Sequence, residues 1–206
     1  MNHSKFVPMK SLLPASFLPV ILLLVASCGP LASRMLGADT SALVDDFADT
    51  AKTARGAGRL LFDDSGAGSK SHATQRVENG VLIVQGELAP GRGAPAFISI
   101  PLLLTPEAKP QDVSAYAGVR LRVKVTQGTL IAQVASADVD NFDYHSAPVA
   151  AKRGEFVDVR VPFADMKRAW SAQTPLNTKL VTSVNLVAFG MAPGAFAYEV
   201  DEIGFY

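Results

Sequence analysis

Residues 138–145 hold the densest group of chemically useful side chains in the sequence. The stretch reads Asp-Val-Asp-Asn-Phe-Asp-Tyr-His and places three carboxylates, an amide, two aromatic rings and an imidazole close together. A sugar site needs an aromatic face for the C–H groups of the ring and polar side chains for its hydroxyls. The candidate ligand-binding residues are therefore Asp138, Asp140, Asp143, Tyr144, His145 and Trp170, the last being the only tryptophan.

Two other interpretations of these residues stay open at this stage. The stretch also fits a polar loop whose Phe142 and Tyr144 are anchored in the core, and Trp170 fits packing within its own loop. The carboxylates could bind Ca²⁺, although the stretch lacks the glycine and the distant glutamate of an EF-hand loop. The sequence alone does not choose between a ligand site and a packed loop.

The sequence gives little evidence for a catalytic site. His72 and His145 lie far apart and do not have the spacing of a His-Glu-x-x-His metal site. Neither a Gly-x-Ser-x-Gly elbow nor a glycine-rich lysine loop for phosphate occurs. Paired carboxylates could serve a glycosidase, but the acidic residues here cluster in turns and at strand ends. We expect a binding or assembly module and no enzyme, with an envelope hydrolase as the third choice.

The N-terminus predicts export and a lipid anchor. Lys5 and Lys10 precede an apolar run, 17–26, that is shorter than the roughly 20 residues needed to span a bilayer. The run leads into Val-Ala-Ser-Cys-Gly at 25–29, which resembles the lipobox of bacterial lipoproteins, and Cys28 is the only cysteine. Because each buried CH₂ adds roughly 0.8 kcal/mol, several acyl chains on Cys28 would anchor the chain stably in the membrane. The alternative is an ordinary secretory signal followed by an incidental cysteine.

These features divide the chain into a signal peptide (1–27), an acylated N-terminus and tether (28–42) and one folded domain (43–206). In the lipoprotein pattern, Gly29 after the cysteine favours the outer membrane of a bacterial envelope, facing the periplasm. Removing Lys5 and Lys10 from the 19 basic residues leaves 17 against 19 acidic residues. A nearly neutral chain lacks the basic surface that nucleic-acid binding requires, so we expect no nucleic-acid partner.

The pattern of the folded domain is that of short strands separated by turns. Alternation of β-branched and charged residues is strictest at 119–125 and clear at 157–161, and Asn79-Gly80 is a strong type I′ hairpin signal. We also expect a hairpin joining 119–125 to 129–136 across Gly128, and another joining 181–189 to 196–206 across the turn 190–194. The fold class predicted is an all-β antiparallel sandwich with negligible helix.

The segment 112–123, DVSAYAGVRLRV, resembles the central signature of the complex I intermediate-associated protein 30 family. Other landmarks of that family lie on both sides of this segment in the expected order, at 45–47, 64–69, 144, 161–163, 194–196 and 201–203. The resemblance implies a galactose-binding-like jelly roll, the fold of many carbohydrate-binding modules, and its eukaryotic members act as assembly factors for respiratory complex I. The expected function is thus a membrane-tethered binding or assembly module with a protein or glycan partner; the alternative is a carbohydrate-binding lipoprotein.

The resemblance also implies a metal site where the two ends of the domain meet. First and last strands commonly lie side by side in such jelly rolls, and a structural calcium ion is often held between them. Asp45 and Asp46 open the domain, whereas Asp201 and Glu202 lie in its final strand. We expect no required cofactor, but a structural Ca²⁺ would relieve the repulsion between these carboxylates.

Overall fold

The computed structural model describes residues 42–91 and 95–206. Among these residues, no helix is long and apolar enough to cross a membrane. Cys28, the predicted signal peptide and most of the predicted tether lie outside the described residues, so lipid attachment stays a prediction.

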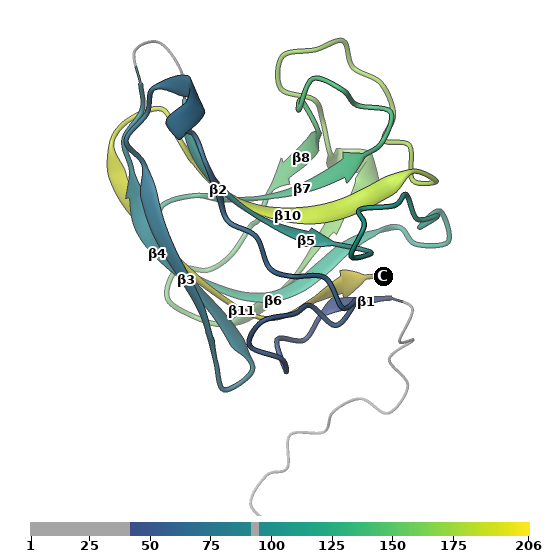
Figure 1. The fold of residues 1–206 in the computed structure, drawn as a ribbon, viewed down its shortest axis with the longest axis horizontal. Helices are drawn as coiled ribbons and strands as arrows, with labels where there is room; N and C mark the ends of the chain where they lie inside the picture. Colours follow the sequence, from purple (N-terminus) through teal and green to yellow (C-terminus); the bar gives the residue numbers. More distant parts are fainter. Residues whose placement is uncertain (1–41, 92–94) are drawn as a thin grey trace, which may run out of the picture. The chain divides into compact units, whose positions relative to one another are not determined.

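The described chain forms two antiparallel sheets packed face to face (Figure 1). The first sheet has the order β3-β4-β11-β6-β9, with β1 added beside β11, and the second has the order β2-β5-β10-β7-β8. This arrangement confirms the predicted β-sandwich. The strands are β1 (Leu43–Asp45), β2 (Phe62–Asp63), β3 (His72–Glu78), β4 (Val81–Leu88), β5 (Ala96–Leu103), β6 (Gly118–Gln127), β7 (Leu130–Ser136), β8 (His145–Pro148), β9 (Val157–Pro162), β10 (Val181–Gly190) and β11 (Gly194–Phe205), and the only helical turns described are the short 3₁₀ helices η1 (Ser65–Ala67) and η2 (Phe163–Asp165).

The core lies between the sheets and follows from the alternation of side chains along each strand. In β6, Val119, Leu121 and Val123 are buried, whereas the basic residues between them face outward. In β5 and β10 the alternate residues Ile98, Ile100, Leu102, Val184, Leu186 and Ala188 are fully buried. Because side chains alternate between the two faces of a sheet, the residues between these positions, 97, 99, 101, 103, 183, 185, 187 and 189, lie on the outer face of the second sheet.

The structure confirms the hairpin predicted at Asn79-Gly80. β3 and β4 pair in register on either side of it, and φ is positive at both turn residues, 53° at Asn79 and 77° at Gly80. Positive φ at both positions is what a type I′ turn requires. The local sequence was sufficient here because the turn residues dictate the pairing.

The other two predicted hairpins are wrong. β6 and β7 lie in different sheets, as do β10 and β11: β7 pairs with β10 and β8, and β11 pairs with β4, β6 and β1. The turns at Gly128 and at 190–194 cross from one sheet to the other, a span of roughly 10 Å. Alternation within a strand identifies its buried face but does not identify the neighbouring strand.

The two ends of the domain meet, as expected for the family. β1 pairs with β11, with Leu43 opposite Gly204 and Asp45 opposite Ile203. The C-terminus is held by backbone hydrogen bonds, because Ala117 N–H donates to Tyr206 O and Tyr206 N–H donates to Gly118 O, at 2.6 and 3.1 Å. The last strand is therefore an internal strand of its sheet.

Candidate ligand-binding face

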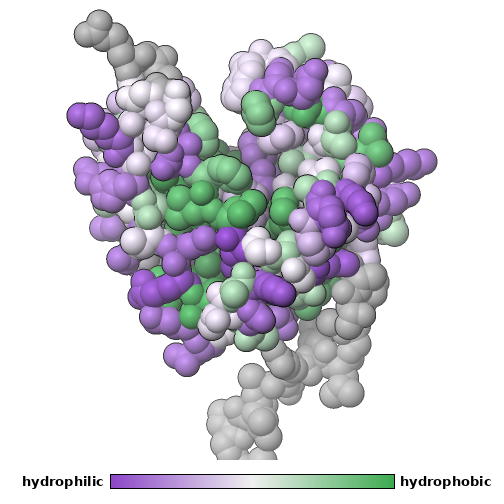
Figure 2. All heavy atoms as spheres, in the orientation of Figure 1, coloured by the Kyte–Doolittle hydropathy of each residue, from purple (hydrophilic) through white to green (hydrophobic). Residues whose placement is uncertain are grey.

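The outer face of the β2-β5-β10-β7-β8 sheet is the most promising surface for a ligand; we call it the hollow face. In Figure 1 this sheet curves between two lobes, one carrying η1 and the other the loops 137–144 and 166–180. Figure 2 shows a hollow between the two lobes, with hydrophobic side chains gathered on one side of it. A concave surface with apolar walls and a few polar groups is the usual form of a binding site.

The residues of the hollow face carry no charge. Strand register and alternation place on it Phe62, Phe97, Ser99, Pro101, Leu103, Ile131, Gln133, Ala135, Ser146, Pro148, Ser183, Asn185, Val187 and Phe189. The outer face of the other sheet is different, because β6, β9 and β11 carry ion pairs such as Lys124–Glu199 and Arg122–Asp201. An uncharged face between charged surroundings suits an uncharged ligand, since a buried charge would find no partner there.

One end of the hollow face carries three phenylalanines. Phe97 and Phe189 face each other across β5 and β10, and Phe62 lies opposite Ser99 at the sheet edge. Phe62 is 54% exposed and Phe97 is 37% exposed, which is unusual for large apolar side chains. Exposed rings on a fixed strand can stack on the C–H face of a sugar or on an apolar side chain of a protein.

Another part of the hollow face is a row of polar side chains. Ser183 Oγ donates to Asn185 Oδ1 at 2.7 Å, and Asn185 Nδ2 donates to Gln133 Oε1 at 3.0 Å. Ser183 and Asn185 are buried, whereas Gln133 is half-buried, so Gln133 is the accessible end of the row. The row fixes the orientation of the Gln133 amide and leaves its Nε2 without a hydrogen-bond partner among the described residues. Gln133 therefore presents an oriented donor to anything bound above it.

A lobe beside the hollow is held together by Asp143, one of the residues singled out in the sequence. Asp143 is 1% exposed, and its carboxylate accepts hydrogen bonds from the backbone N–H groups of Ala169, Trp170 and Ser171 at 2.7, 3.0 and 2.6 Å. Burial raises the pKa of Asp143, but the hydrogen bonds from Ser171, Ala169 and Trp170 outweigh that effect and hold the pKa below its usual value. Arg168 adds a longer ion pair, with 3.8 Å between Nε and Oδ2. The carboxylate thus joins loop 137–144 to loop 166–180.

His145 is also part of the interior. It is buried at the start of β8, and its Nε2 lies 2.7 Å from Thr174 O, to which it donates in the corresponding tautomer. The sequence interpretation treated Asp143 and His145 as hydrogen-bonding side chains for the hydroxyls of a sugar, but their burial gives both residues a structural position. Their burial agrees with the packed-loop alternative, but that alternative also placed Phe142 in the core, where the structure has it 75% exposed.

The remaining candidates of that stretch lie at or near the surface. Trp170 is 70% exposed, and Tyr144 is half-buried with its ring edge-on to Phe142 at 6.3 Å. Asp138 accepts a hydrogen bond from Asn177 Nδ2, and Asp140 is exposed. These four residues share the lobe of loops 137–144 and 166–180. They could contact a ligand at the edge of the hollow, but they do not form its floor.

The sequence interpretation missed the floor itself. Gln133 and Asn185 occur in the predicted strands 129–136 and 181–189, but each is a single residue in an ordinary strand, and Phe62 and Phe97 lie in segments to which no role was given. Their chemistry emerges only when β5, β10 and β7 are placed side by side. The signal that could have found them is the lack of charge at alternate positions of three separate strands.

Arginines neutralise three of the four carboxylates predicted to bind calcium. Asp45 is fully buried and pairs with Arg59 at 2.8 Å, Asp201 pairs with Arg122 at 3.0 Å, and Glu202 pairs with Arg120. Asp46 accepts only from the backbone N–H of Ala48. In the described part of the chain, no three His, Cys, Asp or Glu residues are placed to hold a metal ion. The repulsion between these carboxylates, which motivated the calcium site, is therefore already relieved. Calcium binding stays a prediction, and a comparison of the melting temperature in Ca²⁺ and in chelator would test it.

The comparisons with known proteins agree with this architecture. The chain belongs to the complex I intermediate-associated protein 30 family, whose model matches residues 46–200. No curated protein sequence matches the chain.

Among solved structures, the chain is similar to a family 11 carbohydrate-binding module from Clostridium thermocellum in complex with a β-1,3-1,4-mixed-linked tetrasaccharide. That module is 15% identical, with a TM-score of 0.54 over 80% of this chain and 94% of the module. The family 11 module of the cellulosomal cellulase Lic26A-Cel5E of the same organism is 13% identical, with a TM-score of 0.54 over 79% of this chain and 92% of that chain. At these identities the likeness establishes the fold. Family and fold together describe a member of the complex I intermediate-associated protein 30 family whose β-sandwich resembles that of carbohydrate-binding modules.

Proposed function

We propose that the protein binds an uncharged polysaccharide chain through the hollow face and acts without catalysis. The observation that carries the proposal is the composition of that face: exposed rings of Phe62 and Phe97 beside an amide row that ends in the free Nε2 of Gln133. The rings would stack on the C–H groups of successive sugars, and Gln133 would donate to a ring or hydroxyl oxygen. The tetrasaccharide complex of a module with this fold supports the same class of ligand.

Because the hollow face carries no charged residue, we expect its ligand to be a neutral glycan. A uronate or sulfate group over Val187 or Asn185 would lose water without gaining a cationic partner, because no residue of the hollow face is basic. Hydroxyl groups need only donors and acceptors of the kind that Gln133 and Ser146 provide. Acidic polysaccharides should therefore bind more weakly than neutral ones of the same length.

A glycan array followed by calorimetry tests the proposal. We expect neutral oligosaccharides to be retained, with the mixed-linked tetrasaccharide as the first probe. Gln133→Ala should weaken binding by about three- to tenfold, the effect of losing one hydrogen bond. Gln127→Ala removes the same side chain from the exposed end of β6 in the other sheet and should bind as the unaltered protein does. If Gln133→Ala and Gln127→Ala bind the glycan equally well, Gln133 does not contact the ligand.

A second candidate function is docking of a protein partner in an assembly role. Leu60, Phe62, Phe97 and Met191 are all large, apolar and at least 37% exposed, and exposed apolar patches often mark protein interfaces. A pull-down from the native membrane that recovers one stoichiometric partner, lost in Phe62→Ala, would favour assembly over glycan binding.

We also propose that Cys28 carries the lipid anchor that holds this module at a bacterial membrane. The position of the cysteine after a short apolar run supports the proposal. The anchor and the hollow face are independent features, and each can be tested without the other.

A further inference from the structure

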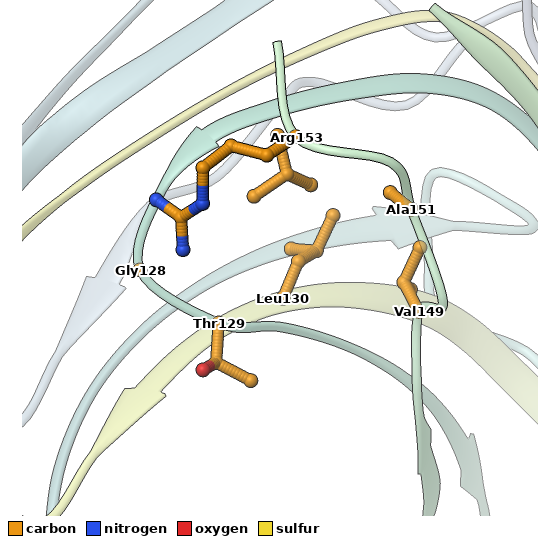
Figure 3. A pocket seen from close by; sticks show the side chains of 7 residues that line it. Gly128, Thr129, Leu130, Val149, Ala151 and Arg153 are labelled. Atoms are coloured by element: carbon orange, nitrogen blue, oxygen red, sulfur yellow. The ribbon is translucent and has the colours of Figure 1, made fainter. Parts of the chain in front are cut away.

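A small cavity of about 190 Å³ opens where the two sheets separate, away from the hollow face. Its apolar wall is made by Val125, Leu130, Val149 and Ala151, and its rim by Gly128, Thr129 and Arg153. Figure 3 shows Leu130 at the centre, Val149 and Ala151 on one side and the extended Arg153 side chain on the other. Leu130 points into the sandwich, whereas its neighbour Ile131 belongs to the hollow face, so the two sites use opposite faces of β7.

Backbone hydrogen bonds hold the cavity in shape. Val149 N–H donates to Leu130 O and Gly154 N–H donates to Val125 O, both at 2.9 Å. These bonds attach the crossing segment 149–156 to both sheets. Gly128 has φ of 74°, and a Cβ there would lie 2.7 Å from Cβ of Phe196. The turn therefore needs glycine, and the cavity exists before any ligand arrives.

Arg153 is the charged group of this cavity. Its NH1 donates to Thr126 O at 2.8 Å, which fixes the guanidinium at the rim. No carboxylate of the described residues lies within ion-pair distance of Arg153. The neighbouring Glu155 is instead paired with Lys152 at 2.7 Å. A guanidinium with one nitrogen fixed to the backbone keeps further N–H groups available for a carboxylate.

We propose that this cavity binds a monocarboxylate with a short apolar tail. The carboxylate would lie against Arg153, and the tail would contact Leu130, Val149 and Ala151. The cavity of about 190 Å³ fits a small acid of about four to six carbons in all, since a pocket for a drug-sized ligand is usually about 300 Å³ or more. The same chemistry is offered by a free short-chain acid and by the C-terminal carboxylate of a peptide that ends in an apolar residue. Because so few atoms make contact, the expected dissociation constant is millimolar.

Titration of the purified protein with sodium butanoate, followed by amide chemical shifts, tests the proposal. The amides of Gly128, Leu130 and Ala151 should shift together and saturate, whereas butanamide, which lacks the charge, should bind about two- to fivefold more weakly. Shifts that are equal with both compounds, or that never saturate, would overturn the proposal.

Substitutions at the cavity give a second, independent readout. Arg153→Gln should weaken butanoate binding about two- to fivefold, the effect of losing an ion pair at an exposed guanidinium, and Ala151→Leu should abolish it by filling the cavity. Ala150→Leu adds the same side chain at an exposed neighbour that does not line the cavity and should leave binding unchanged. If Ala151→Leu folds with an unchanged melting temperature and binds butanoate normally, the cavity is not the site.

The source of the carboxylate can be distinguished in the same assay. A tripeptide ending in leucine with a free C-terminus should displace butanoate if peptide ends are the ligand, and the amidated peptide should not. Displacement by neither peptide, with butanoate binding intact, assigns the cavity to free acids. Glycan binding at the hollow face should be unaffected by Arg153→Gln, so the proposals for the two sites can be tested independently.

Discussion

At the scale of single residues, Asp143 is the most instructive side chain of the molecule. A buried carboxylate without partners would cost several kcal/mol, but three consecutive backbone N–H groups surround this one. The same hydrogen bonds fix the loop that carries Trp170, and Asn141 Nδ2 adds a further bond to Ser171 Oγ at 2.9 Å. The exposed position of Trp170 is therefore held by a buried charge.

Replacing Asp143 with asparagine should cost about 2–4 kcal/mol of unfolding free energy at pH 7, because hydrogen bonds to a charged acceptor are lost. The native pKa of Asp143 lies below its unfolded value, so the contribution is fully present above the unfolded pKa near 4 and is lost as the pH falls through the native pKa. Urea unfolding of both proteins between pH 2 and pH 7 should show the difference shrinking below about pH 4. Asp140→Asn, at an exposed position of the same loop, is the control and should change stability by less than about 0.5 kcal/mol. If Asp143→Asn lowers the unfolding free energy by the same amount at every pH, the charge of Asp143 does not have this role.

At the scale of elements, β11 organises the domain. It lies between β4 and β6, receives β1 near its end, and buries Phe196, Tyr198, Val200, Ile203 and Phe205. Phe205 also packs against Tyr116 and Phe163, with ring centroids 5.5 and 6.2 Å apart. Phe205, at the end of β11, is thus a core residue.

Phe205→Ala should therefore destabilise the domain by about 3–5 kcal/mol, the usual cost of removing a buried phenylalanine ring. Phe142→Ala removes the same ring from a position that is 75% exposed and should cost less than about 0.5 kcal/mol. Thermal unfolding followed by circular dichroism compares the two. Similar melting temperatures for both variants would mean that the C-terminal strand can leave the core without unfolding the domain.

Sequence patterns predicted the strands far better than their partners. The alternation in β6 and β9 and the Asn79-Gly80 turn identified individual strands, and the turn also gave the one correct hairpin. The turns at Gly128 and at 190–194 look equally suited to hairpins, yet each carries the chain between sheets. The choice is made by burial across the whole sandwich, which no local pattern contains. For the same reason, Asp143 and His145 were recognised by type, but their burial was not.

At the scale of the whole molecule, the described chain is one β-sandwich, and we propose that lipidated Cys28 ties it to a membrane. β1 begins the described domain at Leu43, beside the C-terminus, whereas the hollow face lies on the other sheet (Figure 1).

Cys28→Ser tests the proposed anchor directly. Because acylation requires the thiol, the variant should lose labelling by a radioactive fatty acid and should not fractionate as a mature lipoprotein. Ser27→Ala, which keeps a small residue before the cysteine, should still be labelled. Labelling that survives in Cys28→Ser would show that the lipid is attached elsewhere or that the assignment is wrong.

The most direct test of the central claim is calorimetric titration of a neutral oligosaccharide, such as the mixed-linked tetrasaccharide, into Phe97→Ala and into Trp170→Ala. If the hollow face is the binding surface, Phe97→Ala should lose about tenfold or more in affinity through the lost stacking, and Trp170→Ala should lose much less. Unchanged affinity in Phe97→Ala together with abolished binding in Trp170→Ala would move the site to the loops and contradict the account.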